Sequence, residues 1–339
     1  MERASAPGFK PGEIIDPALH GALDSLGLQD SFRQLGFPML AGNVAIWDSH
    51  EERDTPAVRN PYGHGVLIDR SVFETWLLEG VRQSGAEVFA GATGLHSARC
   101  GASWRLQSDS FDIKAGFAVE ATGRSAGQVA PPARRHADHL VCLLAYPEAP
   151  ADFLDCRLHL EAADNGWWYC ALLPGRKLVV ALMVDREALV GQGAASRSQW
   201  FWSEYEKTKL LPRLLARSQL NEPHCRVRGY PAGSSLRCKL GGAGWMVIGD
   251  AAASYDPLFG RGVPVALAKG SASARLLMCG PDLDRQAQRY ANTELETFEQ
   301  YLAEQRTTYQ RAGAIRETRF WQSWQVPEER GRGAEPAVI

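Results

Sequence analysis

Residues 244–262, which read GWMVIGDAAASYDPLFGRG, constrain the fold of this chain more than any other stretch. The apolar run at 244–248 is suited to a short buried strand, and Asp250 follows directly after it. Three alanines, a proline and closely spaced glycines then lead to a helix-like segment that we expect to begin at Pro264. The predicted local structure is a strand, a carboxylate, a glycine-rich turn and a helix.

This arrangement favours a ligand that carries hydroxyl groups and negative charge. A carboxylate at the end of a strand, such as that of Asp250, can accept a hydrogen bond from a ribose or ribitol hydroxyl. The free N–H groups at the start of the following helix attract anionic or electron-rich ligand atoms. An ordinary strand–turn–helix with a capping aspartate is the plainer alternative.

Three earlier stretches carry a resemblance to a known family. They are the FKPGEI sequence at 9–14, the HGVLIDR sequence at 64–70 with GAEV at 85–88, and the FAVEATGRS sequence at 117–125. With the later G-D-A-A…D-P…G-x-G pattern, their order resembles that of FAD-dependent monooxygenase and halogenase-like flavoproteins, which have a p-hydroxybenzoate hydroxylase-like fold. The likeness extends to members that hydroxylate tryptophan during quinocofactor maturation.

The resemblance implies the fold class and the cofactor. The fold is α/β: a glutathione-reductase-like FAD-binding fold, N-terminally incomplete, with an inserted antiparallel β-sheet substrate domain and C-terminal helices. The implied FAD-binding residues are Glu2, Arg70, Ala121, Gly123, Gly249, Asp250, Pro257, Gly260, Gly262 and Val263. No catalytic side chain is implied, because flavin and oxygen carry the chemistry.

One element of the family pattern is missing from this sequence. The family opens with a strand and a G-x-G-x-x-G turn, and an acidic residue that binds ribose follows roughly 20 residues later. This chain has no such turn near its start, and Glu2 stands where the acidic residue would fall. We therefore expect that the first βα unit is missing because the gene start is misassigned or the chain is truncated. A divergent form that has lost tight FAD binding is the alternative.

The predicted organisation is discontinuous. The FAD-binding domain is expected at residues 1–40, 62–130 and 225–280, the substrate domain at 41–61 and 131–224, and a C-terminal helical region at 281–325. Strand-like runs at 140–144, 167–173 and 178–184, the last two joined by a Pro174-Gly175 turn, predict the antiparallel substrate sheet.

Helices are expected at three places outside that sheet. The S-x-x-E pattern at 71–74 predicts a capping box that opens a helix, Gly85 closes it, and a strand begins at Glu87. Residues 197–220 and 284–322 show helical spacing. The expected packing face of the last helix contains Tyr290, Leu295, Phe298, Leu302, Gln305 and Tyr309.

Composition narrows the class of protein. A formal net charge of −2 over 339 residues gives no electrostatic footprint for nucleic acid or an anionic membrane. No apolar run reaches the roughly 20 residues of a membrane span, and no secretory signal is evident. The seven cysteines are scattered without a C-x-x-C pair, which indicates reduced thiols rather than disulfides or a zinc site. These features predict a cytoplasmic enzyme.

The expected activity is oxygen-dependent hydroxylation or oxidation of an aromatic or indole group, on a small molecule or on a tryptophan-containing protein. The G-W-x-W-x-I-P signature of halogenases is broken, because Tyr169 replaces its second tryptophan. The stretch that would hold the halogenase lysine offers Arg33 instead. Thr122-Gly123 replaces an Asp-Gly pair linked to nicotinamide use, so a separate flavin reductase is expected. A halogenase, a prenyl-chain reductase and a non-catalytic remnant that binds a partner are the alternatives.

Three other residues or pairs are weaker candidates. The spacing of His136 and His139 would suit a metal on a helix, although the nearby prolines and arginines favour a solvated linker. His64 could face the flavin, but a turn histidine is the simpler interpretation. Arg261 could contact flavin or an anionic substrate, and a solvent-facing loop arginine is an equal alternative. No metal is predicted.

Overall fold

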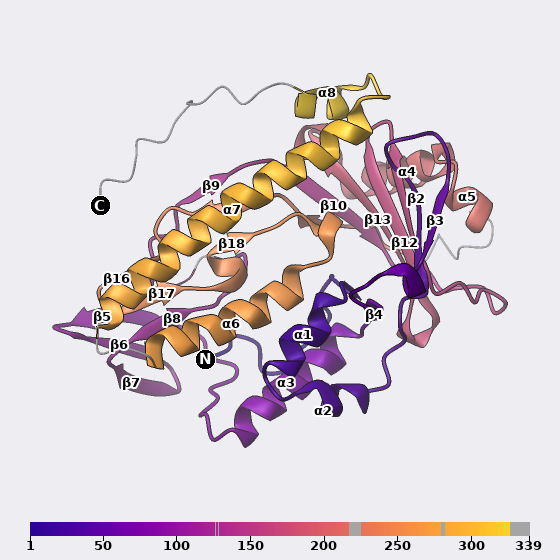
Figure 1. Cartoon of the computed structure of the whole chain (residues 1–339). Helices are drawn as coiled ribbons and strands as arrows, with labels where there is room; N and C mark the ends of the chain where they lie inside the picture. The colour runs from indigo at the N-terminus through magenta and orange to yellow at the C-terminus, as the bar shows by residue number, and fades with distance from the viewer. Residues whose placement is uncertain (126, 128, 217–224, 279–281, 326–339) are drawn as a thin grey trace.

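A seven-stranded sheet forms one side of the molecule (Figure 1). The structure, a computed structural model, describes residues 1–125, 127, 129–216, 225–278 and 282–325. The strand order is β14-β10-β13-β12-β11-β2-β3, and every pair is antiparallel except β11 with β2. The strands are β2 (Gly42–Ile46), β3 (Arg53–Pro56), β10 (Leu140–Ala145), β11 (Leu158–Ala163), β12 (Gly166–Leu173), β13 (Lys177–Asp185) and β14 (Arg228–Pro231).

The central strands of this sheet are buried on both faces. On β12, Trp168 and Cys170 pack against Phe201 and neighbouring residues of α4 (Ala194–Lys207), whereas Trp167 faces the opposite side. Successive side chains of a strand point to opposite faces, so one strand serves two cores. The three predicted strands are present as β10, β12 and β13. Strands β10 and β12 are each one residue longer than expected, and β13 is two residues longer.

The rest of the molecule is built from smaller sheets and helices. The parallel pair β8 (Ala118–Glu120) and β17 (Trp245–Val247) leads into the glycine-rich segment, with β16 (Gly241–Gly242) beside β17. The other strands are β1 (Ile14–Ile15) with β4 (Val66–Leu67), β5 (His96–Cys100) with β6 (Ser103–Ser108) and β7 (Phe111–Ala115), and β15 (Ser235–Arg237) between β9 (Arg134–His136) and β18 (Ala253–Ser254).

Helices surround these sheets (Figure 1). The N-terminal half contributes α1 (Ala18–Asp24), α2 (Gln29–Arg33) and α3 (Arg70–Gln83), and strand β13 of the seven-stranded sheet is followed by α4 and the short α5 (Leu211–Leu214). The C-terminal part contributes α6 (Gly262–Met278), α7 (Leu283–Gly313) and α8 (Arg319–Gln325). The long α7 runs from the small sheets to the seven-stranded sheet, so it connects the two parts of the molecule.

The start of α3 corrects one sequence expectation. The capping residue is Asp69, whose carboxylate accepts the backbone N–H groups of Ser71 and Val72. The predicted capping box at 71–74 is therefore wrong, because Glu74 pairs with Arg70 and Lys10 instead of reaching back to the helix start. Gly85 follows the helix with a φ of 86°, as a glycine after a helix end does.

Two further expectations differ from the structure. The predicted strand at Glu87 is reduced to a single parallel bridge between Ala90 and Glu2, and the backbone hydrogen bonds of this segment to residues 2–4 begin only at Phe89. Leu295 lies outside the packing face of α7 and is exposed, since the adjacent Glu294 occupies the buried position and pairs with Lys269. The helical segment expected at 284–322 is divided into α7 and α8, and part of the one at 197–220 lies outside the described residues.

The chain passes between the sheets at residues other than the expected domain limits. Strand β14 falls in the range assigned to the FAD-binding domain, but it pairs with β10 of the seven-stranded sheet. Strand β9 falls in the substrate-domain range, but it pairs with β15. The division into domains stays a prediction. None of the helices in the described part of the chain is both long and apolar enough to cross a membrane.

A buried ion pair ties the small sheets together. Arg237 on β15 and Glu120 on β8 are 2.5 Å apart, and their side chains are 0% and 1% exposed. Glu120 also accepts the backbone N–H groups of Val129 and Ala130, and Arg237 donates to the carbonyls of Pro131 and Ala251. These bonds satisfy two charges that burial would otherwise make costly.

Replacing Arg237 by methionine should therefore destabilise the fold strongly. The variant leaves the Glu120 carboxylate buried without its cation, which should lower the free energy of unfolding by about 3–5 kcal/mol. Urea denaturation followed by tryptophan fluorescence measures this loss. The control is Arg105→Met, which breaks the exposed Arg105–Asp112 pair and should change stability much less. Equal losses in the two variants would contradict the assigned role of the buried pair.

Candidate active site

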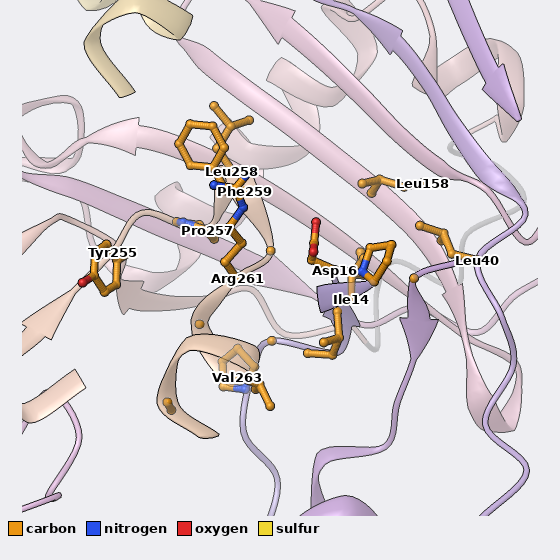
Figure 2. Close-up of a pocket in the computed structure, with 18 of the residues that line it drawn as sticks. Ile14, Asp16, Leu40, Leu158, Tyr255, Pro257, Leu258, Phe259, Arg261 and Val263 are labelled. Atoms are coloured by element: carbon orange, nitrogen blue, oxygen red, sulfur yellow. The ribbon is translucent and has the colours of Figure 1, made fainter. Parts of the chain in front are cut away.

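A cavity of about 650 Å³ lies between the seven-stranded sheet and the glycine-rich segment that follows β17. Its walls come from stretches that are far apart in the sequence: residues 11–17, the β2–β4 region, the start of α3, residues 121–124, strands β11 and β12, and residues 248–267. Figure 2 shows the segment at 255–263 on one side and Ile14, Leu40 and Leu158 on the other. The fold therefore gathers the four motif stretches around one space.

The glycine-rich segment forms one wall because its backbone turns twice. Gly249 and Gly260 adopt left-handed conformations, with φ values of 59° and 62°, which residues with a side chain rarely adopt. Between them, Asp256 caps a short 3₁₀ turn by accepting the N–H of Leu258 at 2.5 Å. Helix α6 then starts at Gly262, two residues earlier than expected, and its first turn lines the cavity.

Nine of the ten predicted cofactor residues line this cavity. They are Arg70, Ala121, Gly123, Gly249, Asp250, Pro257, Gly260, Gly262 and Val263. The tenth, Glu2, does not: it is exposed and bridges Ala90. The structure thus brings together the motif residues that the sequence separates by up to 193 positions, while their role in binding FAD stays a prediction.

Two arginines, each beside a carboxylate, line one part of the cavity. Arg70 donates to the carbonyl of Pro11 at 2.9 Å and pairs with Glu74 at 2.5 Å, and its Nε is buried with no hydrogen-bond partner in the described part of the chain. Arg124 donates to the carbonyls of Gly233 and Tyr255, and its Nε is 3.9 Å from an oxygen of Asp250. The buried Nε of Arg70 is therefore a donor that remains available to an acceptor atom of a ligand.

Asp250 is the carboxylate that the sequence singles out, and its side chain is 41% exposed. Partial burial raises the pKa of Asp250, and the nearby cations of Arg124, Lys269 and Arg134 oppose that shift. Its backbone is held from behind, because Arg134 donates to the carbonyls of both Asp250 and Ala251. A fixed carboxylate that is open to the cavity is available as an acceptor for a ligand hydroxyl.

The other part of the cavity is apolar and aromatic. Leu40, Leu158, Leu160, Trp167, Tyr169, Leu258 and Phe259 line it. The Trp167 indole N–H donates to the Tyr309 hydroxyl at 2.7 Å, so the ring is fixed in the wall. The tryptophan stretch is therefore both sheet core and cavity wall. Such a surface suits an aromatic ligand and excludes water.

A buried network around Asp256 was not anticipated from the sequence. Asp256 accepts hydrogen bonds from the Tyr309 hydroxyl at 2.6 Å and from the Gln305 amide at 3.0 Å, both on α7. Desolvation raises the pKa of Asp256 to about 6, although these two donors oppose the shift. The D-P pair in the sequence marked the turn, but the partners lie about 50 residues away, so local pattern could not identify them.

Of the weaker candidate residues, only Arg261 lines the cavity; His64, His136 and His139 do not. The rings of His136 and His139 stack with centroids 6.1 Å apart, and the described residues contain no group of three or more metal-ligating side chains. The ring of His64 contacts the Leu40 carbonyl and is not among the cavity-lining residues. Arg261 does line the cavity, but its guanidinium lies over Phe259 and 3.5 Å from Glu304.

No lysine lines the cavity within the described part of the chain. Arg33, which stands in the stretch compared with that of the halogenase lysine, is exposed and pairs with Asp30. Its neighbour Phe32 is instead buried against Phe73. The cavity therefore lacks an amine side chain that could hold a halogenating agent.

The raised pKa of Asp256 predicts a specific pH dependence of stability. An aspartate in the unfolded chain titrates near roughly 3.9, so the folded state binds this proton more tightly. The contribution of Asp256 to stability is therefore full below about pH 4 and is lost as the pH rises through about 6. Asp256→Asn cannot titrate there. Between pH 4 and 7 the variant should gain on the order of 3 kcal/mol relative to the wild type.

Urea unfolding of both proteins across this pH range tests the prediction. Comparing the two proteins cancels the titration of the carboxylates that do not interact with Asp256; Asp138, which shares the Gln305 amide with Asp256, is the exception. A stability difference that does not change with pH would show that Asp256 titrates as in the unfolded chain.

No family model matches the chain. Individual proteins of similar sequence are named as flavin oxidoreductases and halogenases. A Marinomonas mediterranea protein that bears the name of an FAD-dependent oxidoreductase, LodB, is 23% identical over 95% of this chain and 88% of its own length. A tryptophan 2-halogenase of Chondromyces crocatus is 24% identical over 97% of this chain and 66% of its own length. The chain thus spans somewhat less than two thirds of that halogenase.

Solved structures show the same fold. The myxobacterial chondrochloren halogenase CndH matches with a TM-score of 0.79 and 20% identity, over 97% of this chain and 80% of its own. The peptidyl tryptophan dihydroxylase QhpG matches with a TM-score of 0.76 and 22% identity, over 96% of this chain and 73% of its own. The expected fold class is confirmed, and the chain is a distant relative, in sequence and in fold, of the FAD-dependent monooxygenase and halogenase-like flavoproteins.

Proposed function

We propose that this protein is an FAD-dependent monooxygenase that hydroxylates or oxidises an aromatic or indole group. The observation that carries the proposal is the composition of the cavity. One part gathers the predicted FAD residues, including Asp250 and Arg70, and the other is an aromatic wall that contains Trp167. Relatives named as an FAD-dependent oxidoreductase, a tryptophan halogenase and a peptidyl tryptophan dihydroxylase support the same chemistry.

The residues present suit the cofactor. The buried Nε of Arg70 has no hydrogen-bond partner within the described residues, and it belongs to a side chain that lines the cavity. Asp250 would accept a hydrogen bond from a sugar hydroxyl of FAD, and Arg124 would offset the charge of its phosphates. The N–H groups of Gly262 and Val263, at the start of α6, would face electron-rich ring atoms. When bound, reduced flavin supplies the activation of oxygen.

The protein's own contribution is to position the substrate and to keep water out. The leucine and aromatic side chains of the apolar part would hold a flat ring against the cofactor end of the same cavity. Trp167 is fixed by Tyr309, and Tyr309 in turn is fixed by Asp256. Tyr309 of α7 therefore holds both Trp167 of the aromatic wall and Asp256 of the glycine-rich segment.

The partners follow from this proposal. The substrate is an aromatic small molecule or a tryptophan-containing protein, as the dihydroxylase named for peptidyl tryptophan suggests. Thr122-Gly123 stands where an Asp-Gly pair would support nicotinamide binding, and Gly123 lines the cavity. A separate reductase would then supply reduced flavin. A flavin-dependent halogenase is the second candidate, because one relative is named a tryptophan 2-halogenase and another, from Pseudomonas fluorescens, is named a chlorinase of a pyrrole carried on a peptidyl-carrier protein.

Asp250→Ala should weaken FAD binding in the full-length protein by about 1–3 kcal/mol, because a hydroxyl of the cofactor, buried once FAD is bound, would lose its acceptor. Titration with FAD, followed by flavin fluorescence and calorimetry, measures the change. Asp185→Ala is the control, since Asp185 is an aspartate at another 3₁₀ turn, which it caps, and it does not line the cavity; Asp250 lies within the turn Gly249–Ala251 and caps nothing. If Asp250→Ala leaves both FAD affinity and thermal stability unchanged, Asp250 is only a turn residue.

A second experiment separates hydroxylation from halogenation. The cavity has no lysine among its described lining residues, and arginine stays protonated and does not readily form a haloamine. Given reduced flavin, isotopic oxygen, bromide and either tryptophan or a tryptophan-containing peptide, the full-length protein should give an oxygen-labelled product. Mass spectrometry identifies the product. A brominated product without the oxygen label would establish the halogenase instead.

A further inference from the structure

Asp16 is a charged residue of the cavity to which no role was assigned from the sequence. It follows β1 directly, and its backbone N–H donates to the carbonyl of Gly260 at 3.3 Å. It therefore lies against the turn that leads into α6. Figure 2 shows its carboxylate in the open space between the 257–259 segment and Leu158.

The carboxylate of Asp16 makes few interactions with the described residues. One oxygen accepts the backbone N–H of Ala18 at 2.8 Å, and no cation pairs with either oxygen in the part of the chain that the structure describes. Its half-buried position leaves it accessible from the cavity.

The other charged side chains that line the cavity are already engaged. Arg70 pairs with Glu74, Arg124 lies 3.9 Å from Asp250, and Arg261 lies 3.5 Å from Glu304. Asp256 receives hydrogen bonds from two donors of α7. Within the described residues, Asp16 is thus the lining carboxylate that neither an ion pair nor a buried donor engages.

The surroundings of Asp16 favour a hydrogen bond between its carboxylate and a donor on a ligand. Leu40, Leu158, Leu258 and Phe259 share its wall, and apolar neighbours strengthen a charge-assisted hydrogen bond by lowering the local dielectric constant. The aromatic rings of the same cavity would attract a cation as well. A ligand with a carboxylate at this point would be repelled.

We propose that Asp16 is a specificity-determining residue, which selects aromatic substrates that carry a nitrogen-bound hydrogen, on a ring or on an ammonium group, over aromatic carboxylates. This inference rests on the proposed function, because it takes the apolar part of the cavity to be the substrate site. Asp16 acts by binding and orienting this donor, and it takes no part in oxygen chemistry.

The test compares three probes that share the indole ring: indole, tryptamine and indole-3-propionate. Calorimetric titration of the FAD-saturated full-length protein should show tryptamine binding at least about tenfold more tightly than indole-3-propionate. Asp16→Asn keeps an oxygen for the Ala18 N–H but removes the charge, so it should abolish this preference. Asp16→Ser does the same with a smaller side chain if the asparagine variant fails to fold. Asp185→Asn, at a cap outside the cavity, should leave the preference intact.

The probes also identify the donor. If Asp16→Asn weakens tryptamine alone, the donor is an ammonium group, and if it weakens indole as well, the ring N–H is the donor. Either result supports the proposal. Equal affinity of the wild type for tryptamine and indole-3-propionate, or a preference that survives in both Asp16 variants, overturns it.

The proposed function can fail separately from this inference. Binding of FAD is measured first, by flavin absorbance, in the same preparations. A protein that binds FAD but shows no preference among the probes refutes the role of Asp16 alone. Absence of FAD binding in the full-length protein, with the expected first βα unit present, refutes the proposed function, whatever the probes show.

Discussion

The buried pair of Arg237 and Glu120 is the interaction on which the cofactor end of the cavity depends. It joins β15 to β8, and through the carbonyl of Ala251 it also reaches the turn after β17. Arg134 reinforces it by donating to the carbonyls of Asp250 and Ala251. A turn rich in alanine and glycine has no side chains with which to fix itself. The guanidinium groups of Arg134 and Arg237 instead fix its shape by donating to its carbonyl groups. The side of the turn that lines the cavity is then left for a ligand.

Helix α7 provides the second constraint, because it contacts both parts of the molecule (Figure 1). Near one end Tyr290 packs beside β17, and towards the other end Tyr309 lies within the core of the seven-stranded sheet. The bonds from Gln305 and Tyr309 to Asp256 attach the middle of the glycine-rich segment to that helix. The two walls of the cavity are thus fixed relative to each other by one continuous element, which is what a reaction between a cofactor and a separately bound substrate requires.

The charged side chains that line the cavity differ between its two parts. Arg70 and Arg124 lie where an anionic cofactor would bind, and each is restrained by backbone carbonyls. At the apolar part, Asp16 presents a negative charge that no cation offsets among the described residues. If the proposed function holds, the cavity would distinguish a polyanionic cofactor from an aromatic substrate by the sign of the charge as well as by shape.

The sequence by itself determined the elements whose signals are local. The strand, turn and helix at 244–262 and the three strands of the substrate sheet follow from apolar runs and glycine positions that neighbouring residues fix. The same kind of reasoning failed where a charged side chain outside the local pattern competed for a partner. Glu74 pairs with Arg70 and Lys10 instead of closing a capping box, and Glu294 takes the buried position near Leu295 because Lys269 neutralises it.

Only the tertiary structure decided the cavity and its network. The contacts that build them join residues far apart in the sequence. Asp256 bonds to Tyr309 across 53 positions, Arg237 pairs with Glu120 across 117, and Asp16 is held at Gly260 across 244. No periodicity within a single segment records such contacts. They arise because buried charges and polar groups must find partners wherever the packed chain brings them, and that requirement is met in space rather than along the sequence.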